Sequence, residues 1–172
     1  MTALPQPLIP FIRDEFSLTY TQSAFVISAF TLANAFAQLP AGWLADRIGT
    51  RILITVGILG VAIAGILVGI SHTYIMLLVC LMLMGLAGGG YHPAATPMIS
   101  MSVEPNQRGR ALGFHLIGGN SAFFLTPVIV AAIVGANILG SGWRGAVLAL
   151  AVPTALFGIF FYLYVSRLPG MS

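Results

Sequence analysis

The sequence predicts an all-α protein, a polytopic membrane bundle of about five transmembrane helices. Of its 172 residues, 58% are hydrophobic and only 6% are charged, and lysine is absent. So little polar surface cannot cover a water-soluble domain, whereas about 20 consecutive apolar residues can cross a membrane core of roughly 30 Å. Five apolar runs reach that length, and we treat residues 1–172 as a single membrane domain. The predicted spans cover residues 20–44, 52–70, 74–100, 111–136 and 144–165.

The charge pattern orients the chain and argues against nucleic acid as a partner. The net charge is +3, but the seven arginines are scattered singly near the ends of the apolar runs. In a membrane protein, the side richer in such residues faces the cytoplasm. With five spans the connectors alternate sides, which predicts a cytoplasmic C-terminus. The side with five arginines carries Arg47, Arg51, Arg108, Arg110 and Arg167, and the other carries Arg13 and Arg144.

Residues 3–16 are interpreted as the frayed end of an apolar element, followed by the charged cluster Arg13, Asp14 and Glu15. The alternation of sides places the N-terminus outside the cell, and this segment lacks the basic and apolar regions of a signal peptide. A missing upstream helix would explain that orientation.

The first span carries polar residues at helical spacing. Thr31, Asn34 and Gln38 recur every three or four residues, so they lie along one face of a helix. One interpretation is that they form hydrogen bonds between helices. The alternative is that Asn34 and Gln38 face a central cavity, because polar groups in a bilayer avoid lipid.

The second span is almost wholly apolar and contains four glycines, so it is predicted to be a packing helix. The third span is the most irregular. It combines a Gly85-xxx-Gly89 spacing with His92, Pro93 and Pro97. Each proline removes a backbone donor, so the helix should bend or open there. Irregular backbone within a membrane must be buried in protein or face water, which favours His92 in a cavity over a purely structural kink.

The fourth span places a second histidine at the same depth. His92 precedes the end of its helix at Ser100 by eight residues, and His115 follows Arg110 by five. Asn120 lies about 8 Å deeper at 1.5 Å per residue. Two histidines at one depth could carry a proton or hold a polar substrate, because imidazole changes charge near neutral pH. Alternatively, backbone carbonyls freed by the prolines satisfy them.

A charged turn, Gly42-Trp-Leu-Ala-Asp-Arg-Ile-Gly-Thr-Arg51, connects the first two spans. Gly42 would allow close helix approach, Gly49 the positive φ of a tight reversal, and Asp46 would accept hydrogen bonds from backbone amides or an arginine. The pattern resembles the loop between helices two and three of the major facilitator superfamily, with Thr50 where a basic residue is usual. A basic hairpin loop without further role is the plainer alternative.

Two further motifs resemble the same superfamily. The order Pro105-x-x-Arg-Gly-Arg110-Ala-Leu-Gly is similar to its loop between helices four and five, and Gly142-Trp-Arg144 is similar to the start of its helix six. Residues 117–127 resemble a stretch of fosmidomycin-resistance-type exporters, although Ser121 and Thr126 stand where glycines are expected. The resemblance implies helices two to six of the N-terminal half, without most of helix one.

The implied function is part of a secondary active transporter that exports a small organic compound or drug, coupled to protons, in a bacterial inner membrane. In this interpretation Gly42, Asp46, Arg47, Gly49 and Arg51 form a gating loop, with Arg108 or Arg110 as the partner of Asp46. The cavity residues would be Asn34, Gln38, His92, His115 and Asn120. One half cannot enclose a substrate, so helix one and a second six-helix half, or a partner chain supplying them, are expected.

Two alternatives belong to other classes. A small membrane protein could pack against a partner through its glycine-rich helices without transporting anything. An intramembrane enzyme could hold a metal between His72, His92 and His115, but no H-E-x-x-H motif or nearby carboxylate accompanies them. We therefore expect no enzyme activity, no metal and no cofactor.

Overall fold

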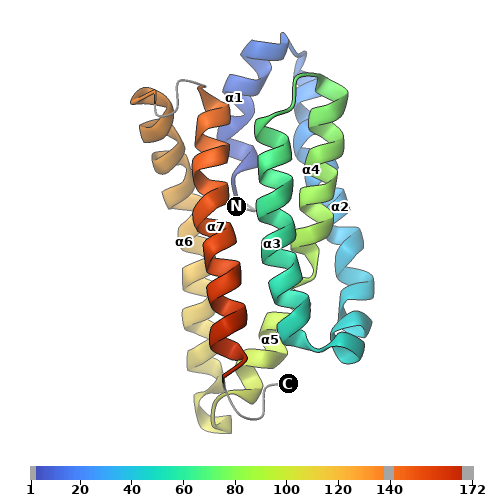
Figure 1. Cartoon of the computed structure of the whole chain (residues 1–172), viewed down its shortest axis with the longest axis vertical. Coiled ribbons are helices and arrows are strands. Elements are labelled where there is room, and N and C mark those ends of the chain that lie inside the picture. The colour runs from blue at the N-terminus through green and yellow to red at the C-terminus, as the bar shows by residue number, and fades with distance from the viewer. Residues whose placement is uncertain (1–2, 138–141, 168–172) are drawn as a thin grey trace.

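The computed structural model describes residues 3–137 and 142–167, and it contains helices and no strand among these residues. Most helices run side by side along the long axis, and the chain passes back and forth between two ends (Figure 1). The all-α fold class is confirmed. The helices are α1 (Pro5–Phe16), α2 (Tyr20–Ile48), α3 (Thr50–Gly69), α4 (Tyr74–Gly89), α5 (Tyr91–Met101), α6 (Arg108–Gly135) and α7 (Trp143–Val165), with a 3-10 turn, η1 (Pro105–Gln107), before α6.

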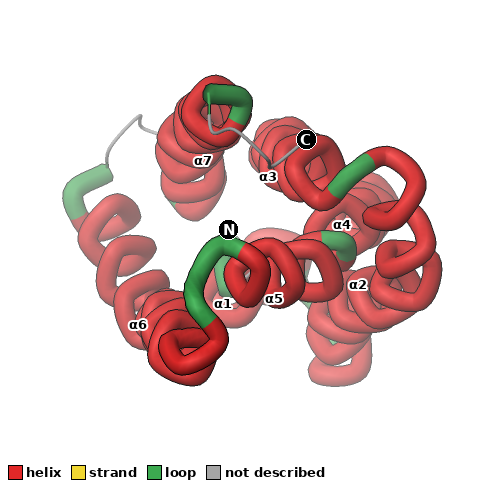
Figure 2. The backbone as a smooth tube through the Cα atoms, turned by 90° about the horizontal axis from the view of Figure 1, so that it is seen from below, coloured by secondary structure: helices red, strands yellow, loops and turns green. Residues whose placement is uncertain are grey.

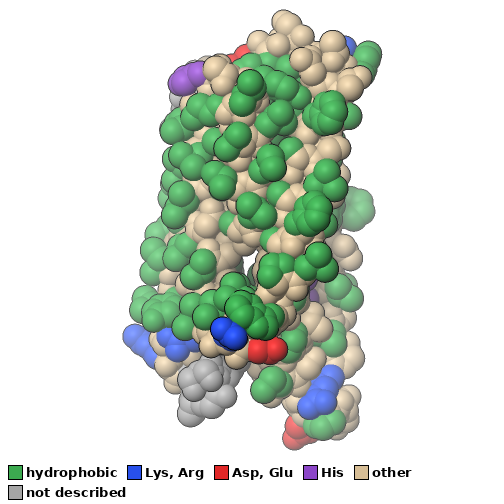
Figure 3. Space-filling model, turned by 90° about the vertical axis from the view of Figure 1, so that its right-hand side faces the viewer, with side chains coloured by type: hydrophobic (Ala, Val, Ile, Leu, Met, Phe, Trp, Pro, Cys, Tyr) green, Lys and Arg blue, Asp and Glu red, His purple; other side chains and the backbone are tan. Residues whose placement is uncertain are grey.

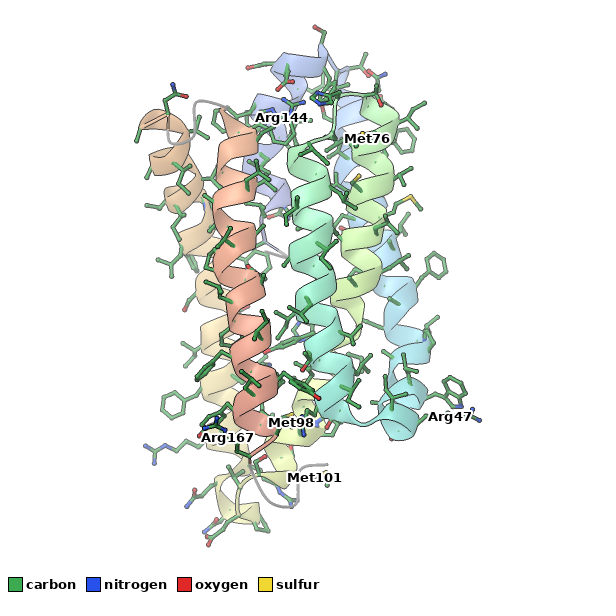
Figure 4. All side chains as sticks on the ribbon, in the orientation of Figure 1. Arg47, Met76, Met98, Met101, Arg144 and Arg167 are labelled. Carbon is green, nitrogen blue, oxygen red and sulfur yellow. The ribbon has the colours of Figure 1, made fainter. Side chains whose placement is uncertain are left out.

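Five stretches of the described residues are long and apolar enough to cross a membrane: α2, α3, α4 with α5, η1 with α6, and α7. Figure 3 shows hydrophobic side chains over the middle of one face, with arginine and acidic side chains gathered toward its lower end. The chain is therefore an integral membrane protein. Arg47 and Arg167 lie at one end and Arg144 lies at the other (Figure 4). We call these the Arg-rich end and the opposite end.

The charged turn is mostly helical. Residues 41–48 contain good helix formers and continue α2 to Ile48, burying Ala41 and Ala45. The chain then reverses at Gly49, whose φ of 87° confirms the predicted positive φ. The predicted close helix approach at Gly42 is wrong, because a Cβ built at this exposed position has nothing within 4 Å.

Helix α1 covers most of residues 3–16, which corrects the expectation of a frayed end. Pro5 and Pro7 stand in the first turn of α1, where proline is tolerated, and Pro10 lies inside the helix. Leu4, Leu8 and Ile12 lie one turn apart and are at most 2% exposed. Seen along the long axis, α1 lies between α6 and the α2–α4 side of the bundle (Figure 2).

Helices α2 and α4 pack at backbone contact through the predicted glycine pair. A Cβ on Gly85 would fall inside contact distance of the Phe30 carbonyl oxygen, and a Cβ on Gly89 would lie 2.6 Å from the Asn34 carbonyl oxygen. Small residues at four-residue spacing permit such an approach between membrane helices. Gly85 and Gly89 therefore fix α4 against α2.

The third span breaks where the sequence predicts a bend. Helix α4 ends at Gly89 and α5 begins at Tyr91, with Gly90 between them. Pro93 then falls in the first turn of the new helix rather than in the interior of the old one. After the break, Tyr91 at the start of α5 contacts His115 of α6.

Candidate functional site

A cavity of about 970 Å³ lies between α2, α3, α5, α6 and α7, with the start of α1 contributing to its wall. Its lining is largely apolar. None of the described residues that line it is an aspartate, a glutamate or an arginine. The polar lining residues are Gln6, Thr31, Asn34, Tyr91, His92, His115, Asn120, Thr126 and Thr154.

His92 on α5 and His115 on α6 both line this cavity, and Tyr91 lies against both of them. The Tyr91 ring centroid is 5.4 Å from that of His92 in an edge-on arrangement, and 5.8 Å from that of His115 at an interplanar angle of 31°. The sequence alone assigned no role to Tyr91. Tyr91 contacts both histidines because the helix breaks at Gly90. The sequence predicts this break but does not give the direction of α5.

Asn34 forms hydrogen bonds and also faces the cavity. Its Nδ2 donates to the Gly85 carbonyl oxygen at 3.2 Å, and its Oδ1 accepts from Nε2 of Gln38 at 3.0 Å. Gln38 is exposed and is not among the residues lining the cavity. Asn120 does line it, from α6. Asn34 therefore combines the two alternatives that the sequence left open, whereas Gln38 reaches the site only through Asn34.

The residues predicted to form a gate lie at the Arg-rich end, but they do not form one cluster. Asp46 has no ion pair with Arg108 or Arg110 in this structure, all three being described and exposed. The reason is geometric: the α2–α3 turn and the start of α6 occupy different sides of this end (Figures 1 and 2). Arg51 instead reaches α7, where its guanidinium lies 4.4 Å from the Tyr162 ring centroid.

Two other arginines of this end, Arg47 and Arg110, stack on aromatic rings of their own helices. The Arg47 guanidinium lies 4.2 Å from the Trp43 ring centroid, and that of Arg110 lies 5.6 Å from the Phe114 centroid. Trp43 is 57% exposed, so this pair stands on the surface of the bundle. Such amphipathic pairs are typical of the boundary between lipid and water.

The opposite end contains a polar cluster that the sequence analysis missed, formed by Glu15, Ser71, Trp143 and Arg144. Arg144 makes a salt bridge to Glu15 and also donates to the buried Ser71 carbonyl oxygen at 2.5 Å. Trp143 Nε1 donates to the other Glu15 carboxylate oxygen at 2.6 Å. This Glu15–Arg144 cluster joins α1, the α3–α4 turn and α7. The only signal in the sequence is that Glu15 and Arg144 belong to connectors on the same predicted side.

We expect the contribution of Glu15 to stability to disappear in acid. Burial alone would raise the pKa of Glu15, but hydrogen bonds from Arg144 and Trp143 and the charges of Arg144 and His72 outweigh it and lower that pKa. A lowered pKa stabilises the folded state above the unfolded pKa of about 4.3 and ceases to do so as the pH falls through the folded value.

Unfolding midpoints of the wild type and of Glu15→Gln, measured in mixed micelles between pH 7 and pH 3, test this expectation. The difference should be largest near neutral pH and shrink below about pH 4.3. A difference that stays constant over the whole range would show that the carboxylate charge contributes nothing.

Comparison with known proteins places this geometry in context. The family model of the Major Facilitator Superfamily matches residues 1–171. A probable sulfoacetate transporter of Cupriavidus necator is 33% identical over 160 residues, which cover 88% of this chain and 35% of that protein. A probable L-galactonate transporter of Escherichia coli is 29% identical over 157 residues, which cover 91% of this chain and 34% of that protein.

More distant matches include a quinolone resistance protein, NorA, of Staphylococcus aureus, 24% identical over 123 residues that cover 72% of this chain and 32% of that one. Among solved structures, a peptide transporter, POT, matches with a TM-score of 0.79 at 19% identity. The match covers 96% of this chain and 34% of the transporter chain. This structural likeness supports the fold alone. The chain spans about a third of the length of the relatives named here.

Proposed function

Because the chain belongs to the Major Facilitator Superfamily, a family of transporters rather than enzymes, we propose that it is most of the N-terminal half of a proton-coupled secondary transporter. Such transporters work by rocking two halves around a site near the middle of the membrane. A chain of about a third of its relatives' length would supply most of one such half. The second half comes from further sequence or from a partner chain.

The observation that carries this proposal is the cavity at the level of His92 and His115. Two imidazoles, a phenol, three side-chain amides and three threonine hydroxyls line a largely apolar space between membrane helices. Ionisable groups inside a membrane are costly and commonly mark a substrate or proton path. In this proposal His92 and His115 carry the coupling proton, and Asn34 and Asn120 contact the substrate.

The start of α1 supports the proposal that a further helical segment precedes it. Leu4, at the N-cap position, has helical φ and ψ of −70° and −38°, and no side chain caps the helix. Ala3 and Leu4 are both buried, and Pro5 and Gln6 line the cavity. Pro5 and Pro7 have no backbone N–H, so in the first four residues of α1 only Gln6 and Leu8 have donors that another helical turn could satisfy. The remainder of helix one would therefore add another wall to the cavity.

The direction of transport and the identity of the membrane are proposed from the sequence resemblance. We propose export of a small organic compound or drug from a bacterial cell across the inner membrane, with the Arg-rich end and the C-terminus in the cytoplasm. The narrower resemblance to fosmidomycin-resistance-type exporters stays a prediction. The relatives named above include organic-acid transporters as well as a drug-resistance protein.

The gating role of the α2–α3 turn is also a proposal. Asp46, Arg47, Arg108 and Arg110 are exposed at the Arg-rich end, where a second half could meet them. Asp46 is free of ion pairs with the described residues here, so it is available to a partner on that half. Gly49 keeps the turn short, which holds Asp46 close to the end of the bundle.

Cysteine substitution tests whether the cavity is an aqueous path. Cys80 is the single native cysteine, and it is buried and replaceable by Ala to give a thiol-free background. We expect His92→Cys and His115→Cys to react with a membrane-impermeant thiol reagent, since both side chains line the cavity. The matched control is Phe124→Cys on α6, because Phe124 is 80% exposed yet absent from the cavity lining, so it should face lipid and stay unreactive.

Reaction at both histidine positions but not at position 124 supports the proposed path. Inert thiols at positions 92 and 115, in protein that inserts normally, would refute it. Proteoliposomes containing the full-length protein, with a pH gradient of either sign, would then give the direction of substrate movement.

A further inference from the structure

Helix α2 presents two different exposed faces beside its buried one. Residues three or four apart share a face of a helix. One face, which we call the small-residue stripe, carries small or polar residues that are all exposed: Ala24, Ser28, Thr31, Ala35, Gln38 and Gly42. The next face, which we call the large-residue stripe, carries large apolar side chains that are 57–80% exposed: Phe25, Leu32, Phe36, Leu39 and Trp43.

The two stripes suit different surroundings. Small and polar residues on a membrane helix are typical of contact with another helix, because they allow close approach and hydrogen bonding. Thr31 of the small-residue stripe lines the cavity, whereas no member of the large-residue stripe does. Large side chains without polar atoms in the membrane core match the acyl chains of lipid. The large-residue stripe therefore has the character of a lipid-facing surface.

The length of α2 places Trp43 at the boundary of the membrane core. The 29 residues of α2 extend about 43 Å at 1.5 Å per residue, which is longer than a core of roughly 30 Å. Tyr20 and Trp43 lie about 35 Å apart along the axis. Aromatic rings gather at the two boundaries between lipid and water, and this separation matches the distance between them. Trp43 therefore lies at the level of the lipid headgroups.

Arg47 and Asp46 continue different stripes beyond this boundary. Arg47 follows Trp43 by four residues, and its guanidinium lies 4.2 Å from the Trp43 ring centroid. Asp46 follows Gly42 by four residues and so belongs to the small-residue stripe. Arg47 makes no ion pair with any described residue, and it points outward from the flank of the bundle (Figure 4). The lipid-facing side of α2 thus ends in a free positive charge.

Two similar pairs of arginine and aromatic ring differ in their surroundings. Arg110 lies over Phe114, but Phe114 lines the cavity. Arg13 lies over Tyr20 at the opposite end, where Asp14 follows it directly in the chain. Among these pairs, only that of Arg47 and Trp43 combines an aromatic ring of a lipid-facing stripe with the excess of arginine at the Arg-rich end.

We infer that the end of α2 holds an anionic phospholipid, with its phosphate on Arg47 and an acyl chain along Trp43 and Leu39. A guanidinium matches a phosphate in charge and in the geometry of its donors. The inference depends on membrane insertion and not on transport. It refines the proposed gate, because it assigns Arg47 to lipid and leaves Asp46 available to a protein partner on the small-residue stripe.

Trp43 itself can report which lipid lies against it, because brominated acyl chains quench tryptophan fluorescence on contact. The chain is reconstituted in bilayers of phosphatidylglycerol, which is anionic, and phosphatidylcholine, which is zwitterionic, with the bromine on one lipid or the other. The second of the two tryptophans, Trp143, is only 4% exposed. The variant Trp43→Phe gives its signal for subtraction.

We expect phosphatidylglycerol to occupy the site about fivefold more strongly than phosphatidylcholine, the preference expected for one arginine at an anionic membrane surface. Arg47→Gln should bring this ratio close to one. The matched control is Arg167→Gln, which removes the same charge from the same end but away from α2, and should leave the ratio unchanged (Figure 4). Salt at about 0.5 M should weaken the wild-type preference by screening.

Three results would each overturn the inference: a ratio near one in the wild type, a preference that survives Arg47→Gln, and an equal loss of preference in Arg167→Gln. The last would show that the net charge of the end, and not a site on α2, attracts the lipid. A Trp43 that neither lipid quenches would also overturn it. That result would assign this face to a protein, either a second half or a second copy of the chain.

Discussion

Replacing Gly85 with Val should destabilise the bundle by about 3 kcal/mol or more, the upper range for overpacking a tight core. A Cβ at this position would collide with the Phe30 carbonyl oxygen and lie 3.0 Å from the Asn34 amide nitrogen. Both of these atoms belong to the α2 backbone, which cannot rotate away as a side chain can. The two helices would have to separate along their length.

Separation of α2 and α4 would also disturb the cavity. The Asn34 side chain donates to the carbonyl oxygen of Gly85 itself, so the bond exists only at the present helix spacing. Asn34 in turn accepts from Gln38. We therefore expect Gly85→Val to release the side-chain amide of Asn34 as well as to lower the free energy of unfolding.

The matched control is Gly113→Val on α6, where a built Cβ has nothing within 4 Å. It should change the free energy of unfolding by no more than about 0.5 kcal/mol. Unfolding in mixed micelles with increasing denaturing detergent, followed by fluorescence of Trp43 and Trp143, measures both variants. Equal effects of the two substitutions would mean that the α2–α4 contact is not tight.

The sequence predicts the parts of this fold that depend on local composition. Apolar runs reveal five spans because crossing a bilayer requires a length of apolar chain, and Gly49 reveals the reversal because few other residues tolerate its φ. The Gly85–Gly89 spacing and the break before Pro93 belong to the same kind of signal. Each of these features has a signal that lies within a few residues of the sequence.

The features that the sequence left undetected depend on contacts between distant residues. Glu15 and Arg144 are 129 residues apart, and no periodicity links them. Tyr91 meets His115 only because the chain restarts as α5 at a particular angle. The failed pairing of Asp46 with Arg108 or Arg110 has the same origin, since residues on the same side of a membrane need not be neighbours within it.

The second large effect is expected from Arg144→Met, which keeps side-chain length and removes the charge and donors. Arg144, on α7, has a side chain that is 16% exposed; it contacts α1 through Glu15 and the α3–α4 turn through Ser71, and its guanidinium lies 4.5 Å from the adjacent Trp143 ring. Its loss leaves the buried Ser71 carbonyl without this donor, a cost of about 1–3 kcal/mol. The Glu15 carboxylate is 42% exposed, so solvent screening limits the additional loss from the broken ion pair.

We therefore expect Arg144→Met to lower the free energy of unfolding by about 2 kcal/mol, mostly through the orphaned carbonyl. The control is Arg13→Met at the same end, whose guanidinium stacks on the exposed Tyr20 ring at 4.1 Å and should contribute only about 0.5 kcal/mol. Glu15→Gln in the Arg144→Met background should cost less than it does alone, because the two share one interaction. Hydrogen exchange of α1 would rise in Arg144→Met if the cluster holds this helix against α7, and unchanged exchange would limit its role to the α3–α4 turn.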